Sequence, residues 1–363
     1  MSTTTLYRHE PDYAVAPGRT LQETIDALGM DQNELAIRTG LDKKTINQII
    51  GGKHPLTQQT AIKLERATGV PARIWNKLEM QYQERLARQK DSARLTEDLD
   101  WLKKIPVREL LQRGVIQPQA DKVSLLREVL AFFGVNNTAE WEEYWTEGFA
   151  CRFRRSKAFE MKPGATATWI RIGELQTQKI ACNPYDKDRF LAVLKELRGL
   201  TVAPVAQWQP RLVALCADAG VAVVLVPEIG GCPVSGLARW LTPEKAIIQL
   251  CLRHKTDDHF WFTFFHEAGH ILKDPKKEVF IEDGNEGDEA EERANQFSTD
   301  FLIPPSQAKQ LPTLRSKTSV AAFAQSLGIA AGIVVGQMQK RGIIPYSFLN
   351  DLKQKLMWGG EKS

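Results

Sequence analysis

Two histidines and a glutamate carry the clearest chemistry in this chain. His266, Glu267 and His270 form an H-E-x-x-H pattern inside the apolar run Phe-Phe-His-Glu-Ala-Gly-His-Ile-Leu. Residues four apart lie on one face of a helix, so both imidazoles can point at one ion, with the carboxylate beside the first of them. Such a set suits a zinc-dependent hydrolase, in which imidazoles hold the metal and a carboxylate acts on the metal-bound water. The pattern therefore predicts a zinc site that needs a third protein ligand.

A second helix that could supply this ligand follows an acidic stretch. Glu291 and Asn295 are four residues apart and share a face of it, and Pro304-Pro305 ends it. The loop Glu278–Glu289, which precedes this helix, is expected to be a solvated acidic loop, with a lid or a regulatory surface as the alternative. The helix is predicted from apolar residues at helical spacing, namely Ala290, Ala294, Phe297 and Phe301.

A small α+β unit is expected to position the motif helix. Apolar, β-branched runs separated by glycine and proline predict strands, and a sheet of these strands would back the metal helix. The expected elements are the helix Trp208–Ala219, the strands Val221–Val226, Ser235–Leu241 and Ala246–Cys251, and the motif helix Asp258–Leu272.

Residues 210–310, approximately, resemble the ImmA/IrrE family of metallopeptidases. That family carries H-E-x-x-H on one helix and E-x-x-A-N-x-F on the next, followed by a Leu–Pro ending. Here the second motif reads Glu291-Glu292-Arg293-Ala294-Asn295-Gln296-Phe297, and Leu302-Ile303-Pro304 closes it. The segment departs from the family at Ser298-Thr299-Asp300, where a small apolar run is usual.

The resemblance implies that Zn²⁺ is bound by His266, His270 and Glu291. Asn295, on the same face as Glu291, can hydrogen-bond a ligating histidine. Glu292, which lies about 100° further round the helix, and Glu289 stay open as alternative third ligands. His254 and His259 are expected at the surface or at a strand end, with assistance to an oxyanion as the alternative.

The mechanism that follows is hydrolysis of a peptide bond. The metal would lower the pKa of its water, and Glu267 would take the proton and pass it to the leaving amine. A structural or degenerate metal site is the alternative.

The N-terminal 87 residues show short helices separated by capping residues and glycines. Asp31 and Asp42 are predicted N-caps, and Gly40 and Gly51-Gly52 are predicted stops. Together these signals predict a bundle of five helices that contains a helix-turn-helix.

Residues 17–87, approximately, resemble the XRE-type DNA-binding domain, in its HigA-antitoxin branch. The resemblance rests on Gln32-x-x-Leu35-Ala36-x-x-x-Gly40 and on Leu41-x-x-x-Thr45-Ile46-x-x-Ile49-x-x-Gly52-Lys53. It implies that the helix after the turn enters the major groove of double-stranded operator DNA. Side chains expected to face base edges are Lys43, Lys44, Asn47 and Gln48, while Gln32 and Lys53 would hold phosphates.

The predicted DNA-binding segment carries little net positive charge for a protein that would bind DNA as a monomer. From Gln32 to Arg66 there are six basic residues against three acidic, which is weak for a single DNA-binding unit, so a homodimer or a larger homo-oligomer is expected. The whole chain has 363 residues and a formal net charge of +4, which permits nucleic-acid binding without requiring it. Its five scattered cysteines and the absence of an apolar leader or membrane-length run predict a cytoplasmic protein with no membrane partner.

The remaining segments show no catalytic pattern. The middle reads as a helical spacer, and its basic run, residues 151–156, is expected to be a solvated or ion-paired face. The tail is expected to form a helix pair that packs on the catalytic unit, with Gly332 and Gly336 allowing close approach. Tyr346 could reach the active site as an oxyanion partner.

The fold class predicted is multidomain, mainly α with α+β. The predicted segments are a helix-turn-helix bundle over 1–87, a helical connector over 88–205, a zincin-like metallopeptidase unit over 206–315 and a helical extension over 316–363. The predicted function is a DNA-binding transcriptional regulator that cleaves a protein partner, either a repressor or a toxin. The alternatives are a HigA-like antitoxin and autorepressor with an inactive or sensing metal domain, and a peptidase whose N-terminal bundle serves only dimerisation.

Overall fold

The computed structural model describes residues 14–147, 162–276, 279–282 and 289–359. The basic run 151–156 and much of the acidic loop therefore lie outside the described residues. The chain divides into two compact units, Met1–Asp98 and Leu99–Ser363. Each unit is described by itself below.

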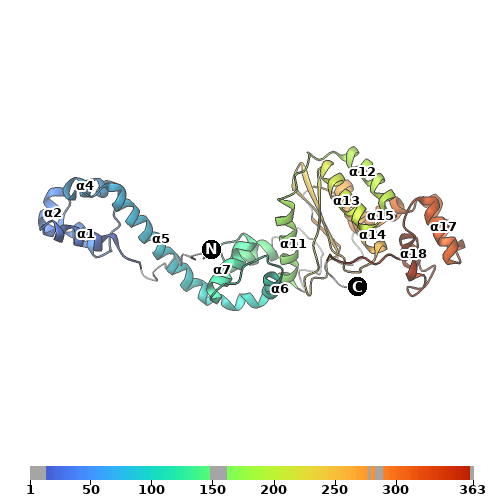
Figure 1. Ribbon diagram of the computed structural model, residues 1–363, viewed down its shortest axis with the longest axis horizontal. Helices are drawn as coiled ribbons and strands as arrows, with labels where there is room; N and C mark the ends of the chain where they lie inside the picture. Colours follow the sequence, from blue (N-terminus) through green and yellow to red (C-terminus); the bar gives the residue numbers. More distant parts are fainter. Residues whose placement is uncertain (1–13, 148–161, 277–278, 283–288, 360–363) are drawn as a thin grey trace, which may run out of the picture. The chain divides into compact units, whose positions relative to one another are not determined.

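The described part of the first unit is a bundle of five helices around a single core (Figure 1). Trp75 lies at its centre with no exposed surface, and its indole nitrogen donates to the Val70 carbonyl oxygen at 3.2 Å. The helices are α1 (Pro17–Ala27), α2 (Gln32–Thr39), α3 (Lys43–Ile50), α4 (Gln58–Thr68) and α5 (Ala72–Glu97).

The predicted caps define the helix-turn-helix. The Asp31 carboxylate accepts from the Glu34 amide at 2.7 Å and begins α2, and the Asp42 carboxylate accepts from the Thr45 amide at 2.8 Å and begins α3. Between these helices Gly40 has a φ of 63°, a left-handed conformation that favours glycine. The sharp turn sets α3 across the bundle, with Ile46 and Ile49 buried and its other face exposed.

α5 extends ten residues beyond position 87, where the sequence predicted the end of the bundle. Its second half continues because it contains good helix formers and neither glycine nor proline. The boundary predicted at 87 thus lies within a helix, and the division into four segments remains a prediction.

The second unit is built on a four-stranded sheet with the order β1-β3-β2-β4. β1 pairs with β3 in parallel, whereas β2 runs antiparallel to both β3 and β4. The strands are β1 (Val221–Leu225), β2 (Gly236–Thr242), β3 (Lys245–Leu250) and β4 (Val279–Glu282). The first three correspond to predicted strands, whereas β4 lies where the sequence predicted a loop, because pairing with β2 extends this short segment.

Helices cover both faces of the sheet. Figure 1 shows α11 (Pro163–Thr177) on one side, and α13 (Val205–Asp218), α14 (Asp257–Lys273) and α15 (Glu289–Leu302) on the other. On the α11 side, the Gln249 side chain of β3 donates to the Trp169 carbonyl oxygen at 2.7 Å, and Gly173 leaves room for it. The helix α12 (Lys187–Leu200) buries Phe190 and Leu194 in the core on the other side.

These contacts differ from the predicted role of residues 88–205 as a spacer. α11 and α12 belong to the unit that holds the sheet, because their apolar faces are covered by it and by its neighbouring helices. Ahead of them lie the helical segments η1 (Leu99–Lys104), α6 (Val107–Gln112), α7 (Lys122–Phe133), α8 (Thr138–Trp141) and η2 (Glu142–Glu147).

The C-terminal tail packs against the metal-motif helix, as the sequence predicted. Glycines of α18 face the first turn of α14, and a Cβ at Gly336 would lie 2.7 Å from an Asp258 carboxylate oxygen. Tyr346, by contrast, is 68 % exposed. The tail comprises α16 (Pro305–Ala308), η3 (Leu311–Thr313), α17 (Lys317–Leu327), α18 (Ala331–Lys340) and η4 (Asn350–Leu352).

Residues of the C-terminal tail contact the first turn of α14. Lys353 Nζ lies 2.7 Å from the Asp258 carboxylate, and the Gln354 amide donates to Asp257 Oδ1 at 2.9 Å. Asp257 and Asp258 are both buried. One buried lysine thus stands beside two buried carboxylates.

This excess of buried negative charge makes stability depend on pH. Burial, and secondly the Asp258 carboxylate, raise the pKa of Asp257 to about 6. The folded state therefore binds a proton that the unfolded chain releases, so this contribution to stability is present below about pH 4 and is lost as the pH rises through about 6.

Asp257→Asn removes the charge but keeps an oxygen for the Gln354 amide. We expect it to raise the free energy of unfolding of the second unit by about 1–2 kcal/mol at pH 8 and by less at pH 5. Urea denaturation at both pH values measures this, and a loss of stability at pH 8 would contradict it.

Within the described residues no single helix is long and apolar enough to cross a membrane. α17 and α18 pass that test only as a pair, bent by 112°. The described cysteines are free thiols; they are Cys182, Cys216, Cys232 and Cys251.

Candidate metal centre and nucleic-acid interface

Two helices bring two histidines and a glutamate together. His266 Nε2 and His270 Nε2, both on α14, lie 3.0 Å apart. Glu291 comes from α15 and places one carboxylate oxygen 3.1 Å from His266 Nε2 and the other 3.4 Å from His270 Nε2. The three side chains can each offer one ligand atom within 4.8 Å of the others. The sequence-predicted ligands are thus close enough to share one ion.

Small residues set the spacing between the two helices. A Cβ at Gly269 would lie 3.3 Å from Ala294 Cα and 3.1 Å from the Phe297 ring, so this glycine permits close contact. Ser298 Oγ donates to the Phe262 carbonyl oxygen at 2.9 Å and joins the helices further along. Ser298, at the predicted departure from the ImmA/IrrE pattern, is therefore buried in the contact between the helices. Close packing at these points brings Glu291 within reach of the histidines.

The other ring nitrogen of each histidine is held by an oxygen. His266 Nδ1 lies 3.0 Å from Asn295 Oδ1, as the predicted role of Asn295 requires, and His270 Nδ1 lies 2.8 Å from Asp274 Oδ2. Arg293 in turn contacts the second oxygen of Asp274 at 2.6 Å. Sequence reasoning missed Asp274 and Arg293. The signal that could have found them is the position of Asp274 four residues after His270, on the same helix face.

The donor set suits a divalent cation. In the tautomer in which each Nδ1–H donates to its oxygen neighbour, each Nε2 is free to offer its lone pair to an ion beside Glu291. Two imidazole lone pairs and a carboxylate anion in one buried place are the ligands that zinc takes.

Glu267 lies beside this set, on the side of the sheet. It is fully buried, and a Cβ at Gly236, the first residue of β2, would collide with its carboxylate. The glycine therefore lets the strand pass close to the carboxylate. The sheet backs the motif helix at this point, as the sequence predicted. The alternatives Glu289 and Glu292 are exposed.

Asp274 gives a test of the metal centre. Asp274→Ala removes the oxygen that orients His270, so we expect the affinity for Zn²⁺ to fall by about 10–100-fold. Competition with a chromophoric chelator measures it. Asp300→Asn, on the solvent side of α15, is the matched control and should bind zinc like the unchanged chain. Equal affinities in the two variants would remove Asp274 from the site.

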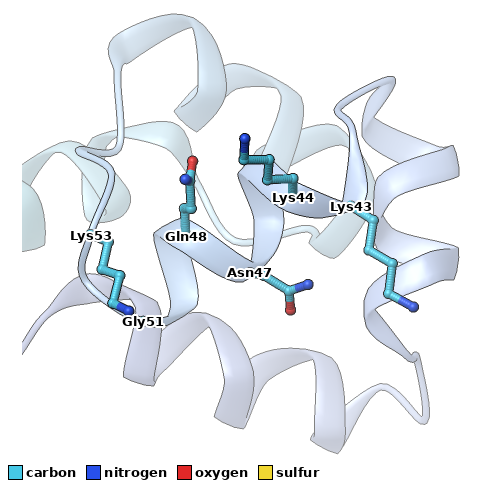
Figure 2. Close-up of a pocket in the computed structure, with 6 residues that line it drawn as sticks. All are labelled: Lys43, Lys44, Asn47, Gln48, Gly51 and Lys53. Carbon is cyan, nitrogen blue, oxygen red and sulfur yellow. The ribbon is translucent and has the colours of Figure 1, made fainter.

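The second candidate site lies on the exposed face of α3. Lys43, Lys44, Asn47, Gln48 and Lys53 surround one hollow, together with Gly51 (Figure 2). Four of these side chains come from α3 itself, whose buried residues hold its opposite face in the core. Basic and amide side chains on one exposed helix face are the set that reads base edges and phosphates.

Gln32, the remaining predicted DNA contact, does not line this hollow. It begins α2, and its side-chain amide donates to Gln22 Oε1 on α1 at 2.9 Å. The structure therefore brings five of the six predicted DNA contacts together.

Two family models match the chain, one in each unit. Residues 21–75 match the helix-turn-helix family, and residues 241–334 match the IrrE N-terminal-like domain of peptidase family M78. The first match contains the face of α3, and the second contains both metal helices. No match is found among curated proteins.

Two solved structures are similar to part of the chain. One is described as an antidote protein of a plasmid maintenance system from Nostoc punctiforme, with 25% identity, covering 23% of this chain and 91% of its own, at a TM-score of 0.22. The other is an addiction module antidote protein of the HigA family from Coxiella burnetii, with 24% identity, 23% and 92% coverage, and a TM-score of 0.22. Such TM-scores do not show a shared fold over the chain, and the two family models are the informative matches. They support a DNA-binding regulator with a metallopeptidase-like domain, in which residues 21–75 form an XRE-type helix-turn-helix segment and residues 241–334 an ImmA/IrrE-like segment.

Proposed function

We propose that this protein binds operator DNA and hydrolyses a protein partner at a zinc site. The observation that carries the proposal is the meeting of His266, His270 and Glu291 beside the buried carboxylate of Glu267. The partner would be a repressor or a toxin, and the setting would be the cytoplasm.

The residues of the chain would divide the work of peptide hydrolysis. His266, His270 and Glu291 would hold the ion, and Asn295 and Asp274 keep the histidines in the tautomer that leaves Nε2 free to ligate. Zinc, when bound, supplies Lewis acidity that acidifies water and polarises a carbonyl group. The Glu267 carboxylate accepts the proton of the attacking water and donates it to the nitrogen of the leaving amine. Burial of this carboxylate keeps bulk water away from the proton transfer.

Binding to the operator would bring the proposed peptidase activity to one place on the DNA. Lys43, Lys44, Asn47 and Gln48 would face the bases, and Lys53 would hold a phosphate. A homodimer would place two such faces on two half-sites and double the number of phosphate contacts.

The decisive experiment identifies cut proteins directly. The zinc-loaded full chain is added to an extract of the cells that express it, and new protein N-termini are identified by mass spectrometry. A small set of new N-termini that disappears when zinc is removed by a chelator supports the proposal. Purified chain that holds no zinc and makes no new N-terminus, but retains a toxin from the extract, would favour the antitoxin function instead.

A further inference from the structure

A basic hollow lies on the motif helix, two turns before the metal ligands. His259, Thr263, His266 and His270 follow one another at intervals of four, three and four residues, so they form one stripe along α14. His259 stacks on His254, with ring centroids 4.2 Å apart and planes 24° from parallel. The stacked pair therefore continues the same helix face that carries the metal ligands.

Positive charge surrounds this pair. Arg253, His254, Lys255 and His259 all line the hollow, and among the described residues that line it none is Asp or Glu. Two carboxylates of the first turn of α14 lie close to this pair, where Asp258 is paired with Lys353 and Asp257 accepts the Gln354 amide. These two acids are thus engaged by the C-terminal tail, while part of each basic side chain remains accessible to solvent.

The hollow adjoins the Glu267 carboxylate. Ser235 and Thr263 line its inner end, and the next residue, Gly236, would place a Cβ 2.6 Å from Thr263 Cγ2 and against Glu267 Oε1. The first residue of β2 therefore touches both the inner end of the hollow and the Glu267 carboxylate.

We propose that this hollow binds an acidic side chain of the peptide substrate, a reading that rests on the proposed peptidase function. Seven residues separate His259 from His266, a rise of about 10 Å at ~1.5 Å per residue. An extended peptide covers this distance in about three residues. The structure thus assigns to the substrate an Asp or Glu about three residues from the cleaved bond.

The pKa values of the pair would report a bound anion. Burial, and then Arg253, lower the pKa of His254, against an opposing effect of Asp258. Burial also lowers the pKa of His259; Asp258 opposes it, and His254 and Lys353 add to it. A carboxylate bound between the rings and Arg253 would stabilise the protonated imidazoles and raise both values.

Libraries of internally quenched peptides test the proposal, each with Glu, Gln or Lys fixed at one position. With the zinc-loaded full chain we expect about 10-fold faster cleavage of Glu peptides than of Gln peptides when the fixed residue lies about three positions from the cut. The Lys255→Glu and Arg253→Glu/Lys255→Glu proteins should reverse this preference in favour of Lys. Lys195→Glu, an exposed position on α12, is the matched control and should keep the preference for Glu. Zinc content and thermal unfolding of each variant show that it is folded.

A binding measurement separates this inference from the proposed hydrolysis. Fluorescence anisotropy follows the same libraries on the Glu267→Gln protein, and NMR follows the pKa of His254 and His259. Binding of Glu peptides that raises both pKa values and depends on Arg253 and Lys255 supports the hollow even if nothing is cleaved. Cleavage without preference at any position, or a preference that survives charge reversal, overturns it. If the peptides are neither cleaved nor bound, both proposals are overturned.

Discussion

The Glu267→Gln protein is expected to keep its zinc and to cleave its protein partner about 10²–10⁴-fold more slowly than the unchanged chain. The amide has the shape of the carboxylate, so it still fits against Gly236 in the buried space beside β2. It cannot accept a proton from water, so the proton transfer is lost. The metal ligands are untouched, because they are His266, His270 and Glu291 in the proposed site.

Zinc content by elemental analysis and the rate of partner cleavage measure the two effects separately. Glu292→Gln is the matched control, because Glu292 is exposed on the same helix as Glu291. It should retain both zinc and activity, whereas Glu291→Gln should lose zinc. Unchanged cleavage by the Glu267→Gln protein would refute the role of Glu267, and loss of zinc from the Glu292→Gln protein would revive Glu292 as the third ligand. Because the Glu267→Gln protein should bind its protein partner without cleaving it, the partner should also co-purify with this variant.

The second large effect is expected on DNA recognition. Asn47→Ala and Gln48→Ala each remove an amide that can bond a base edge, at a cost of about 1–3 kcal/mol per bidentate contact. We expect the double variant to bind its operator at least about 30-fold more weakly, while its affinity for unrelated DNA changes little. Both positions lie on the exposed face of α3 (Figure 2), whose core residues are Ile46 and Ile49, so the bundle should stay folded.

Selection from a pool of random DNA sequences identifies the operator. Fluorescence anisotropy at several salt concentrations then measures the affinity of each variant for the operator and for unrelated DNA. Lys53→Ala is the informative contrast, because the loss of a phosphate contact would weaken binding to all sequences and reduce the salt dependence by about one ion. Gln59→Ala, an exposed amide on α4, is the control and should change nothing. An unchanged preference for the operator in the double variant would place base recognition elsewhere.

The elements predicted best are those with strong local signals. The helices α2 and α3 begin at Asp31 and Asp42 because each carboxylate caps a free amide, and this chemistry depends on neighbouring residues only. The approach of His266 to His270 was predictable for the same reason, since a spacing of four residues on one helix is set by the helix itself. Glu291 needed the resemblance to a family, because its distance from the histidines depends on how two helices pack.

The elements that were missed depend on distant partners. β4 is a strand because β2 pairs with it, and its run of three apolar residues, Val279, Phe280 and Ile281, is too short to predict a strand inside an acidic segment. α11 was assigned to a connector because nothing local shows that Trp169 and Gly173 meet the sheet through Gln249. Arg293, on another helix, reaches the second oxygen of Asp274, and this contact depends on how the two helices pack. Such long-range contacts leave little trace in a local sequence pattern.

The contact between the C-terminal tail and the first turn of α14 affects the order in which the chain can fold during synthesis. The Gln354 amide that meets Asp257 comes 97 residues later in the chain, whereas the first unit has a core of its own within residues 21–78. During synthesis from the N-terminus, the helix-turn-helix can therefore fold long before the motif helix receives its last partner. A ribosome still translating the tail would already display a folded DNA-reading unit, with the metal helix incomplete.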